Sequence, residues 1–350
     1  MLMIPGPTPV PEQVLLAMAK HPMGHRSGEF STLMAEVTEN LKWLHQTQND
    51  VLILAASGTG AMEAGIINFL RQGDRVLVGN NGKFGERWGK LARTYGLAVE
   101  EITAEWGQPL PPEAFKAALE ADIDKQIKAV IVTHSETSTG VLNDLETINR
   151  YVKAHGDALI IVDAVTSLGA CSVPVDEWGL DVVASGSQKG YMIPPGLAFV
   201  SVSPKAWSAY PTANLPRFYL DLGPYRKDGA KHTTPFTPPV NLFFALQAAL
   251  KMMRSEGLEA IFARHDRQRR ATRAAMAALN LPLFGSDTCA SPAITAVMPD
   301  QVDAEQVRLV MKKRFDIALA GGQDHLKGKI FRIGHLGFVC DRDKIGRAHV

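Results

Sequence analysis

Short apolar runs alternate with longer amphipathic stretches along most of this chain. A short apolar run bounded by turn residues is typical of a strand buried on both faces, whereas apolar residues at helical spacing indicate a helix. The pattern predicts strands at Val51–Leu54, Arg75–Val78, Ala98–Ile102, Lys128–Thr133, Leu159–Asp163, Val182–Ala184 and Leu197–Val202. It predicts helices at Ser31–Gln46, Gly60–Leu70, Phe84–Tyr95, Pro112–Leu119, Leu145–His155 and Asn241–Met253.

This alternation predicts an α/β fold whose mostly parallel sheet is covered by helices on both faces. Ligands of such sheets bind beyond the carboxyl ends of the strands. Farther along, the chain predicts a long basic helix at Gly257–Leu279, a strand at Ala293–Met298, a helix at Asp303–Arg314 and a strand at Ile330–Ile333. We therefore expect an N-terminal arm at residues 1–20, a large domain at 21–255 and a small α+β domain at 256–343.

The last seven residues, 344–350, show no hydrophobic pattern and no helix cap. Their letters match the translation of a common sequencing-library adapter, so we interpret them as a non-native tail. We expect the natural chain to continue beyond Asp343. On this interpretation the small domain is truncated by roughly one helix of average length.

Composition narrows the classes of function. The 350 residues carry a net charge of +1, with 46% apolar and 21% charged residues, so the charge balance favours neither nucleic-acid nor membrane binding. A secretion signal has a basic segment followed by an apolar run, and the N-terminus shows no such pattern. The three cysteines are widely spaced and odd in number, so they suit a reducing compartment and predict no metal site. We expect a cytoplasmic enzyme.

The most informative pair is an aspartate and a lysine that follow two buried strands. Asp163 ends the run Leu159–Asp163, and Lys189 comes shortly after the run Asp181–Ala184. Pyridoxal 5′-phosphate (PLP) needs such a pair, since the lysine forms a Schiff base and the carboxylate keeps the pyridine nitrogen protonated. Singly, Asp163 could cap a helix and Lys189 could be a solvated loop lysine. The remaining motifs favour the cofactor.

Two of these motifs could hold a phosphate and a ring. Ser57-Gly58-Thr59-Gly60 follows the first strand and opens a helix, where small residues let backbone N–H groups approach a phosphate. It is neither a P-loop nor a dinucleotide fingerprint, and a plain Gly-rich turn is the alternative. Phe84, between glycines at the next strand end, could stack on a planar ring or belong to the core.

Three further motifs could contact a cofactor or substrate. The segment 133–140 is too polar for a core, although His134 could be purely structural. The segment 231–239 is rich in proline and hydroxyls and could also be an ordinary connector. Arg332 lies within an apolar strand, where it could clamp a carboxylate or form a structural ion pair.

Read in order, these motifs resemble the class V aminotransferases of PLP fold type I, in particular the alanine–glyoxylate and serine–pyruvate group and its cyanobacterial-like subgroup. The likeness spans the chain up to about Asp343. It is carried by the strings at residues 5–9, 57–59, 82–85, 136–141, 162–169, 185–189, 232–235 and 331–334. The resemblance implies a seven-stranded-type sheet in a large PLP-binding domain, and a homodimer with shared active sites.

The resemblance also implies residue roles. Lys189 is the Schiff-base lysine, Asp163 the pyridinium partner, and Phe84 the residue stacked on the ring. Arg332 and Pro7 are implied to bind substrate, and Thr233 to reach the neighbouring subunit's phosphate. The remaining cofactor contacts implied are Ser57, Gly58, Thr59, Thr137, Val165 and Gln188. No metal is expected.

The implied reaction moves an amino group from alanine, serine or aspartate to a 2-oxo acid, with glyoxylate as the favoured acceptor. One departure is Ala230, which replaces a tyrosine that touches the partner's phosphate in some relatives. A cysteine desulfurase would need a cysteine within Ala320–Lys329 and a histidine directly before Lys189, and the chain has neither. A non-catalytic accessory subunit is the second alternative, since members of this subgroup are labelled as a soluble hydrogenase subunit.

Overall fold

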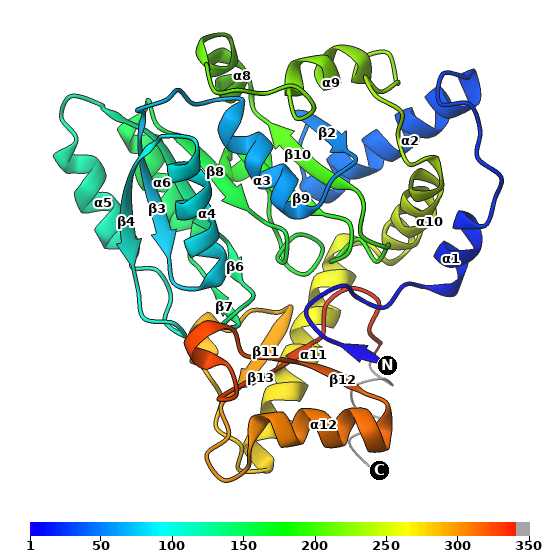
Figure 1. Cartoon of the computed structure of the whole chain (residues 1–350), viewed down its shortest axis with the longest axis vertical. Coiled ribbons are helices and arrows are strands. Elements are labelled where there is room, and N and C mark those ends of the chain that lie inside the picture. The colour runs from blue at the N-terminus through cyan, green and yellow to red at the C-terminus, as the bar shows by residue number, and fades with distance from the viewer. Residues whose placement is uncertain (341–350) are drawn as a thin grey trace.

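The computed structural model describes residues 1–340 of the chain (Figure 1). The interpretation of residues 344–350 as a non-native tail lies outside the described residues. A large α/β unit, which holds the main sheet, occupies the upper part of the view in Figure 1. A smaller unit below it is built from the first strand and the part of the chain from about residue 258 to 340.

The main sheet has seven strands in the order β2-β10-β9-β8-β5-β3-β4. Their bounds are β2 Asp50–Leu54, β3 Arg75–Asn80, β4 Ala98–Thr103, β5 Ile127–Thr133, β8 Leu159–Asp163, β9 Val182–Gly186 and β10 Ala198–Val202. β10 pairs antiparallel with both β2 and β9, and the other neighbours pair parallel. The expected mostly parallel seven-stranded sheet is therefore confirmed.

The apolar runs form strands because both faces of the sheet are covered. Successive residues of a strand point to opposite faces. In β5, Val130 and Val132 belong to the core cluster on one face, whereas Ala129 and Ile131 belong to the cluster on the other. A strand with two buried faces needs an uninterrupted apolar run, which is what the sequence shows.

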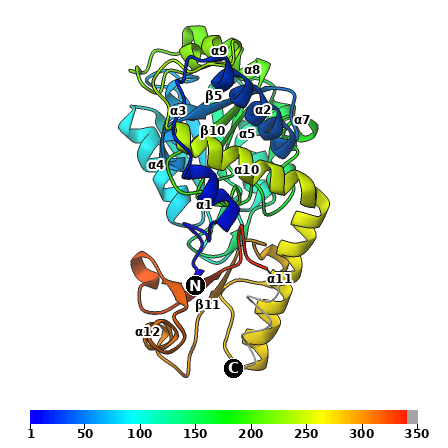
Figure 2. The ribbon, with the colours of Figure 1, turned by 90° about the vertical axis from the view of Figure 1, so that its right-hand side faces the viewer.

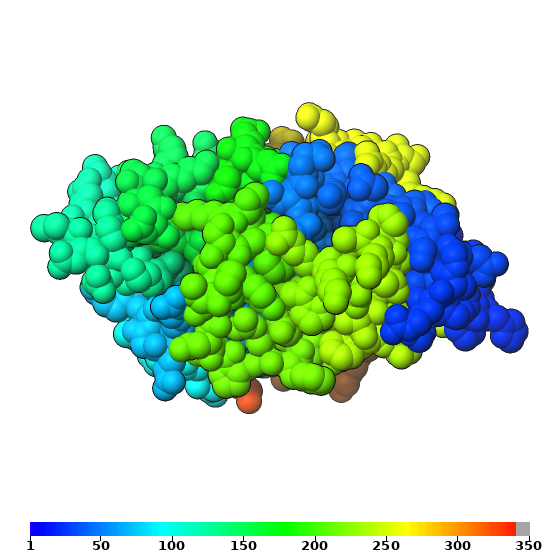
Figure 3. Space-filling view, turned by 90° about the horizontal axis from the view of Figure 1, so that it is seen from above, coloured from blue at the N-terminus to red at the C-terminus, as the bar shows by residue number. Residues whose placement is uncertain are grey.

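Helices cover both faces of the sheet and one side of the small unit (Figures 1 and 2). Their bounds are α1 Glu12–Met18, α2 Gly28–His45, α3 Gly58–Ile67, α4 Lys83–Thr94, α5 Pro112–Ala121, α6 Leu145–His155, α7 Val175–Trp178, α8 Pro204–Ala209, α9 Leu222–Gly229, α10 Val240–Glu256, α11 Leu258–Ala278 and α12 Ala304–Phe315. Seen from above, the segment that carries α8 and α9 covers the centre of the large unit (Figure 3). α11 leads from the large unit down one side of the small sheet (Figure 2).

The small unit contains a four-stranded sheet in the order β1-β12-β13-β11. The strands are β1 Leu2–Met3, β11 Ile294–Val297, β12 Ala318–Gly321 and β13 Phe331–Gly334. β1 pairs parallel with β12, while α1 packs against α10 of the large unit. The N-terminal arm therefore links the two units, and its turn at residues 5–9 passes the carboxyl end of the main sheet.

The sequence predicted every strand of the main sheet but missed short elements elsewhere. β12 was missed because its short apolar run ends in two glycines, Gly321 and Gly322, and α7 because it has a single turn. A two-stranded ribbon, β6 Ser135–Glu136 with β7 Val141–Leu142, was also missed. Among residues 1–340, no helix is long and apolar enough to cross a membrane. Nor do three or more His, Cys, Asp or Glu side chains gather there in a group suited to a metal ion.

Candidate active site

A cavity of about 310 Å³ lies at the carboxyl ends of the main-sheet strands. Its walls come from the N-terminal arm, from the segments after β2, β5, β8 and β9, and from the first turns of α3 and α4. The residues that line it are Gly6, Pro7, Ser57, Gly58, Thr59, Met62, Phe84, Arg87, Ser135, Thr137, Asp163, Val165, Thr166, Gln188, Lys189 and Pro195. Ten of the twelve residues proposed from the sequence are in this set, and Thr233 and Arg332 are not.

Lys189 is held by the N-terminal arm. It follows β9, and its Nζ donates a hydrogen bond to the carbonyl of Pro5 at 2.8 Å. Thr8 braces the same loop, because its hydroxyl donates to the Lys189 carbonyl and its N–H to the Gln188 carbonyl. At Gly6, φ is +147° and a Cβ would come within 2.8 Å of the lysine side chain, so glycine is required. The Pro-Gly-Pro string therefore forms one wall around the lysine.

The surroundings of Lys189 make its amine unusually easy to deprotonate. Burial lowers the pKa of Lys189 to about 8, and the nearby Asp163 carboxylate opposes this shift. A larger fraction of the amine is therefore neutral near pH 7 than for an exposed lysine. Only a neutral amine has the lone pair needed to attack a carbonyl or to accept a proton.

Asp163 ends β8, directly beside Ala184 of β9 and Thr133 of β5. Its Oδ1 accepts a hydrogen bond from the N–H of Val165 at 2.9 Å. Burial raises the pKa of Asp163 to about 6, while the Val165 bond and the positive charges of Lys189 and Arg87 lower it. A cation placed against this carboxylate, such as a protonated pyridine nitrogen, would further favour its charged form.

The first turn of α3 offers a phosphate cradle. α3 starts at Gly58, two residues earlier than the sequence predicted, and the Ser57 side chain makes no capping hydrogen bond. A Cβ at Gly58 would lie 2.9 Å from the Val165 side chain, so only glycine lets the turn come this close. The N-terminus of a helix attracts anions through its unpaired N–H groups.

The cavity residues fit PLP. They supply a buried amine, a buried carboxylate and a helix N-terminus with hydroxyl donors, which match the aldehyde, the ring nitrogen and the phosphate of the cofactor. The buried Oε1 of Gln188 has no hydrogen-bond partner within residues 1–340, as expected for a side chain that contacts a ligand.

Arg87 also lines the cavity, and the sequence interpretation missed it. Its guanidinium lies 4.7 Å from the centre of the Phe84 ring and donates to the Thr59 hydroxyl at 3.2 Å. Phe84 and Arg87 are three positions apart in α4, so they share one face of the helix. That spacing after a Gly-rich helix start was the signal available in the sequence.

Arg332 lies behind the cavity wall. Its side chain is buried and donates to the carbonyls of Thr137 and Gly321, at 2.8 and 2.9 Å. Burial lowers the pKa of Arg332 to about 10, and the nearby Glu136 opposes this shift. Within residues 1–340 no carboxylate lies within salt-bridge distance of its guanidinium, so the structural ion pair considered from the sequence has no partner there.

Two other sequence candidates lie outside the cavity. Thr233 follows α9, and its hydroxyl oxygen is buried without a hydrogen-bond partner in the described part of the chain. His134 packs edge-on against Trp178, and burial lowers its pKa to about 4. A neutral buried histidine that does not line the cavity fits the structural interpretation considered from the sequence.

Comparisons with known proteins show which proteins this chain is similar to. The family model described as Aminotransferase class-V matches residues 1–334. A Synechococcus protein named "Soluble hydrogenase, small subunit" is 78% identical, covering 98% of this chain and 89% of its own. The L-aspartate–glyoxylate aminotransferase of Paracoccus denitrificans is 39% identical, covering 97% and 87%. The crystal structure of a Nostoc alanine–glyoxylate aminotransferase superposes with a TM-score of 0.92 at 32% identity, covering 99% and 91%.

Proposed function

The chain belongs to the class V aminotransferases, and from this premise we propose that it moves an amino group from alanine, serine or aspartate to glyoxylate. Proteins of this family use PLP. The observation that carries the proposal is the placing of Lys189 and Asp163 in one cavity with the α3 cradle. The substrates are supported by the resemblance and by the names of the Paracoccus and Nostoc relatives.

Bound in this cavity, PLP would supply an aldehyde that takes up amines and a ring that withdraws electrons from the adjacent carbon. Lys189 would hold the cofactor, and once the amino donor has displaced it, its free amine would take the proton from the substrate Cα. Asp163 would keep a proton on the ring nitrogen through a charge-assisted hydrogen bond. Ser57, Gly58, Thr59 and Gln188 would hold the phosphate and other cofactor groups, and Phe84 and Val165 would contact the ring.

Arg332 is proposed to bind the substrate α-carboxylate, and Pro7, which lines the cavity, to contact the substrate. The hydrogen bond from Arg332 to the carbonyl of Thr137, another cavity residue, supports this role. The guanidinium of Arg332 is close enough to influence the charge of Lys189. Thr233 is proposed to act in the cavity of a second subunit, since its hydroxyl lies outside the cavity of its own chain. This assignment is part of the proposed homodimer with shared active sites.

Replacing Arg332 with alanine is expected to raise KM for the amino donor and for the 2-oxo acid together. Both substrates carry the carboxylate that the guanidinium binds, and losing a buried hydrogen-bonded charge contact costs on the order of 2–5 kcal/mol. Steady-state kinetics with both substrates varied will measure the change, and PLP affinity should stay near that of the wild type. A rise in KM for one substrate alone would show that Arg332 does not bind their common group.

The experiment that tests the proposed acceptor compares glyoxylate with 2-oxoglutarate. Glyoxylate has no side chain, whereas 2-oxoglutarate needs extra space and a second cation for its distal carboxylate. We expect kcat/KM for glyoxylate to exceed that for 2-oxoglutarate by more than about tenfold, equivalent to about 1.4 kcal/mol in transition-state binding. Equal or better use of 2-oxoglutarate would refute glyoxylate as the preferred acceptor. It would not affect the proposed roles of Lys189 and Asp163 in the PLP chemistry. Arg87 would then be the candidate for the distal carboxylate.

One observation favours a second candidate function. The Synechococcus relative is named as a hydrogenase subunit, which supports the alternative that this chain is a non-catalytic accessory protein. A purified accessory protein would lack the yellow colour of a PLP enzyme and would leave added amino donors unchanged. Colour together with donor-dependent loss of that colour would favour the aminotransferase.

A further inference from the structure

A buried glutamate beside the cavity has no place in the mechanism described so far. Glu136, in β6, is fully buried and does not line the cavity. Its Oε2 accepts the N–H groups of Phe84 and Gly85 at 3.0 and 3.1 Å. Its Oε1 accepts the N–H and the hydroxyl of Ser138 at 3.0 and 2.5 Å. The three N–H groups can only donate, which favours the carboxylate form. Burial raises the pKa of Glu136, and the hydrogen bonds from Ser138 and Gly85 oppose this shift.

This carboxylate caps the helix that carries Phe84. The first N–H groups of a helix lack partners within it, and a negative charge there is stabilising. Gly82, which precedes α4, makes no side-chain cap, so the caps come from a distant loop. Ser138 supplies a further cap, because its hydroxyl accepts a hydrogen bond from the N–H of Lys83 at 3.0 Å. A Cβ at Gly82 would come within 2.4 Å of Glu136, so glycine is needed for this close approach.

The same loop reaches two other parts of the site. Between Glu136 and Ser138 lies Thr137, whose carbonyl accepts the hydrogen bond from Arg332. The Thr137 hydroxyl bonds that of Thr166 at 2.6 Å, three residues after Asp163. The Glu136 carbonyl closes the turn by accepting the N–H of Gly140. One short loop therefore contacts the helix start under Phe84, the arginine clamp and the loop after Asp163.

We propose that Glu136 is a positioning residue that sets the distance between the ring-covering Phe84 and the carboxylate-binding Arg332. It does not touch cofactor or substrate. Its carboxylate fixes the first turn of α4 against the loop 136–138, and that loop fixes the guanidinium through the Thr137 carbonyl. The negative charge of Glu136 also offsets the positive charge of Arg332. The proposal rests on the proposed function, because it assumes a PLP enzyme. Its main test measures PLP affinity and not amino transfer, so the two can fail separately.

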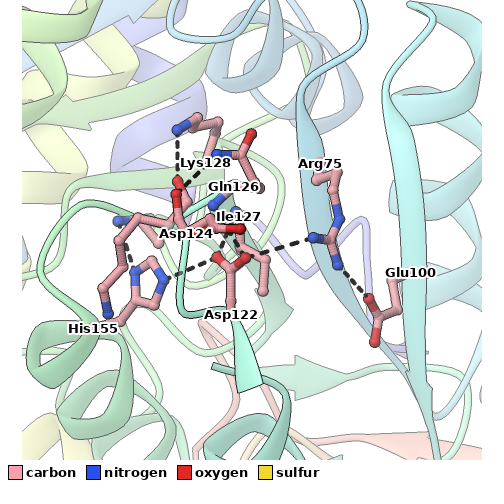
Figure 4. A network of polar contacts seen from close by, with 10 residues as sticks. Arg75, Glu100, Asp122, Asp124, Gln126, Ile127, Lys128 and His155 are labelled. Carbon is pink, nitrogen blue, oxygen red and sulfur yellow. Dashed lines mark hydrogen bonds and ion pairs between the residues drawn. The ribbon is translucent and has the colours of Figure 1, made fainter. Parts of the chain in front are cut away.

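The chain offers a control for Glu136 at the opposite end of β5, the strand that leads to the loop of Glu136. Asp122, just before β5, is also a buried carboxylate (Figure 4). It accepts the N–H groups of Gln126 and Ile127 at 3.1 and 2.7 Å, and it contacts His155 and Arg75. Glu136 follows the carboxyl end of β5 and Asp122 precedes its amino end, so only Glu136 lies near the cavity. Asp122→Asn reports the cost of losing a buried carboxylate that accepts two backbone N–H groups but lies away from the cavity.

The test compares Glu136→Gln with Asp122→Asn. Glutamine keeps the shape but turns an NH₂ group toward donors, so the cap is broken without leaving a hole. We expect Glu136→Gln to weaken PLP binding by the apoprotein, followed by fluorescence quenching, by about tenfold or more. It should also raise KM for both substrates. Both variants should lower Tm by similar amounts, since each loses a buried carboxylate. Asp122→Asn should nevertheless leave the Kd for PLP within about twofold of the wild-type value.

A double-mutant cycle with Phe84→Ala shows whether Glu136 acts through that ring. If it does, adding Glu136→Gln to Phe84→Ala weakens PLP binding much less than it does in the wild type. Should Glu136→Gln fail to fold, Ser138→Ala removes only the hydroxyl shared by Lys83 and Glu136, and a smaller shift in Kd is expected. The proposal is overturned if the folded variants bind PLP as the wild type does, or if Asp122→Asn weakens binding equally. Wild-type protein that binds PLP but transfers no amino group would refute the proposed function instead.

Discussion

Replacing Lys189 with alanine is expected to abolish amino transfer while the protein still folds and still binds PLP. The lysine supplies both the covalent attachment and the base in this account, and removing a positioned base alone costs about 10²–10⁴-fold in rate. Alanine leaves the cradle at Ser57, Gly58 and Thr59 untouched, so the phosphate end keeps its contacts. Rates should fall to the level of the assay without protein.

Two measurements check this result. Borohydride treatment of the holoprotein, followed by mass spectrometry, should leave PLP fixed to Lys189 in the wild type and release it from the variant on denaturation. Initial rates with alanine, serine or aspartate and glyoxylate should then separate loss of catalysis from loss of cofactor. Turnover near the wild-type rate in Lys189→Ala would refute the assignment of the base.

The environment of Lys189 also predicts the pH dependence of cofactor capture. The neutral amine is the reactive form, and its fraction grows as the pH rises through a pKa of about 8. The rate at which apoprotein attaches PLP should therefore increase between about pH 7 and 9 and level off above that range. A rate that kept rising toward pH 10 would indicate a lysine in an ordinary aqueous environment.

Replacing Asp163 with asparagine has the second large expected effect. Asparagine keeps the size of the side chain and can still accept the N–H of Val165, but it cannot balance the charge of a protonated ring nitrogen. Hydrogen bonds to charged groups contribute about 1.5–3 kcal/mol, so proton removal from Cα should slow by roughly 10–100-fold. PLP affinity should change much less, because the phosphate contacts remain.

Single-turnover experiments with substrate deuterated at Cα will measure this step directly. The variant should show a slower reaction and a kinetic isotope effect at least as large as that of the wild type. If the single-turnover rates of Asp163→Asn and wild type coincide, Asp163 is a structural carboxylate and another group protonates the ring.

The sequence predicted the main sheet well because a strand buried on both faces leaves a continuous apolar run. It also predicted which polar side chains follow those strands, so Asp163 and Lys189 were expected at neighbouring strand ends, where the structure has them. The order of strands in space was not readable, since β10 and β2 lie at one edge although they are far apart in the chain. Pairing between such segments leaves no local mark in composition or periodicity.

What the sequence did not reveal depends on contacts across the fold. Glu136 looked like one more polar residue in a polar loop, because its partners at Phe84 and Gly85 are about fifty positions away. Arg87 was not singled out from the sequence, because its contacts with Phe84 and Thr59 form only in the fold. Arg332 was recognised as unusual within an apolar strand, yet only the structure shows that it reaches the cavity wall through Thr137.

The central claim is tested most directly by following the amino nitrogen itself. The PLP-loaded protein is incubated with glyoxylate and with alanine, serine or aspartate whose amino nitrogen is isotopically labelled. We predict that at least one donor passes its label to glycine and becomes the corresponding 2-oxo acid in equal amount, and that Lys189→Ala forms no labelled glycine. Absence of labelled glycine with all three donors, in protein shown to hold PLP at Lys189, would contradict the account.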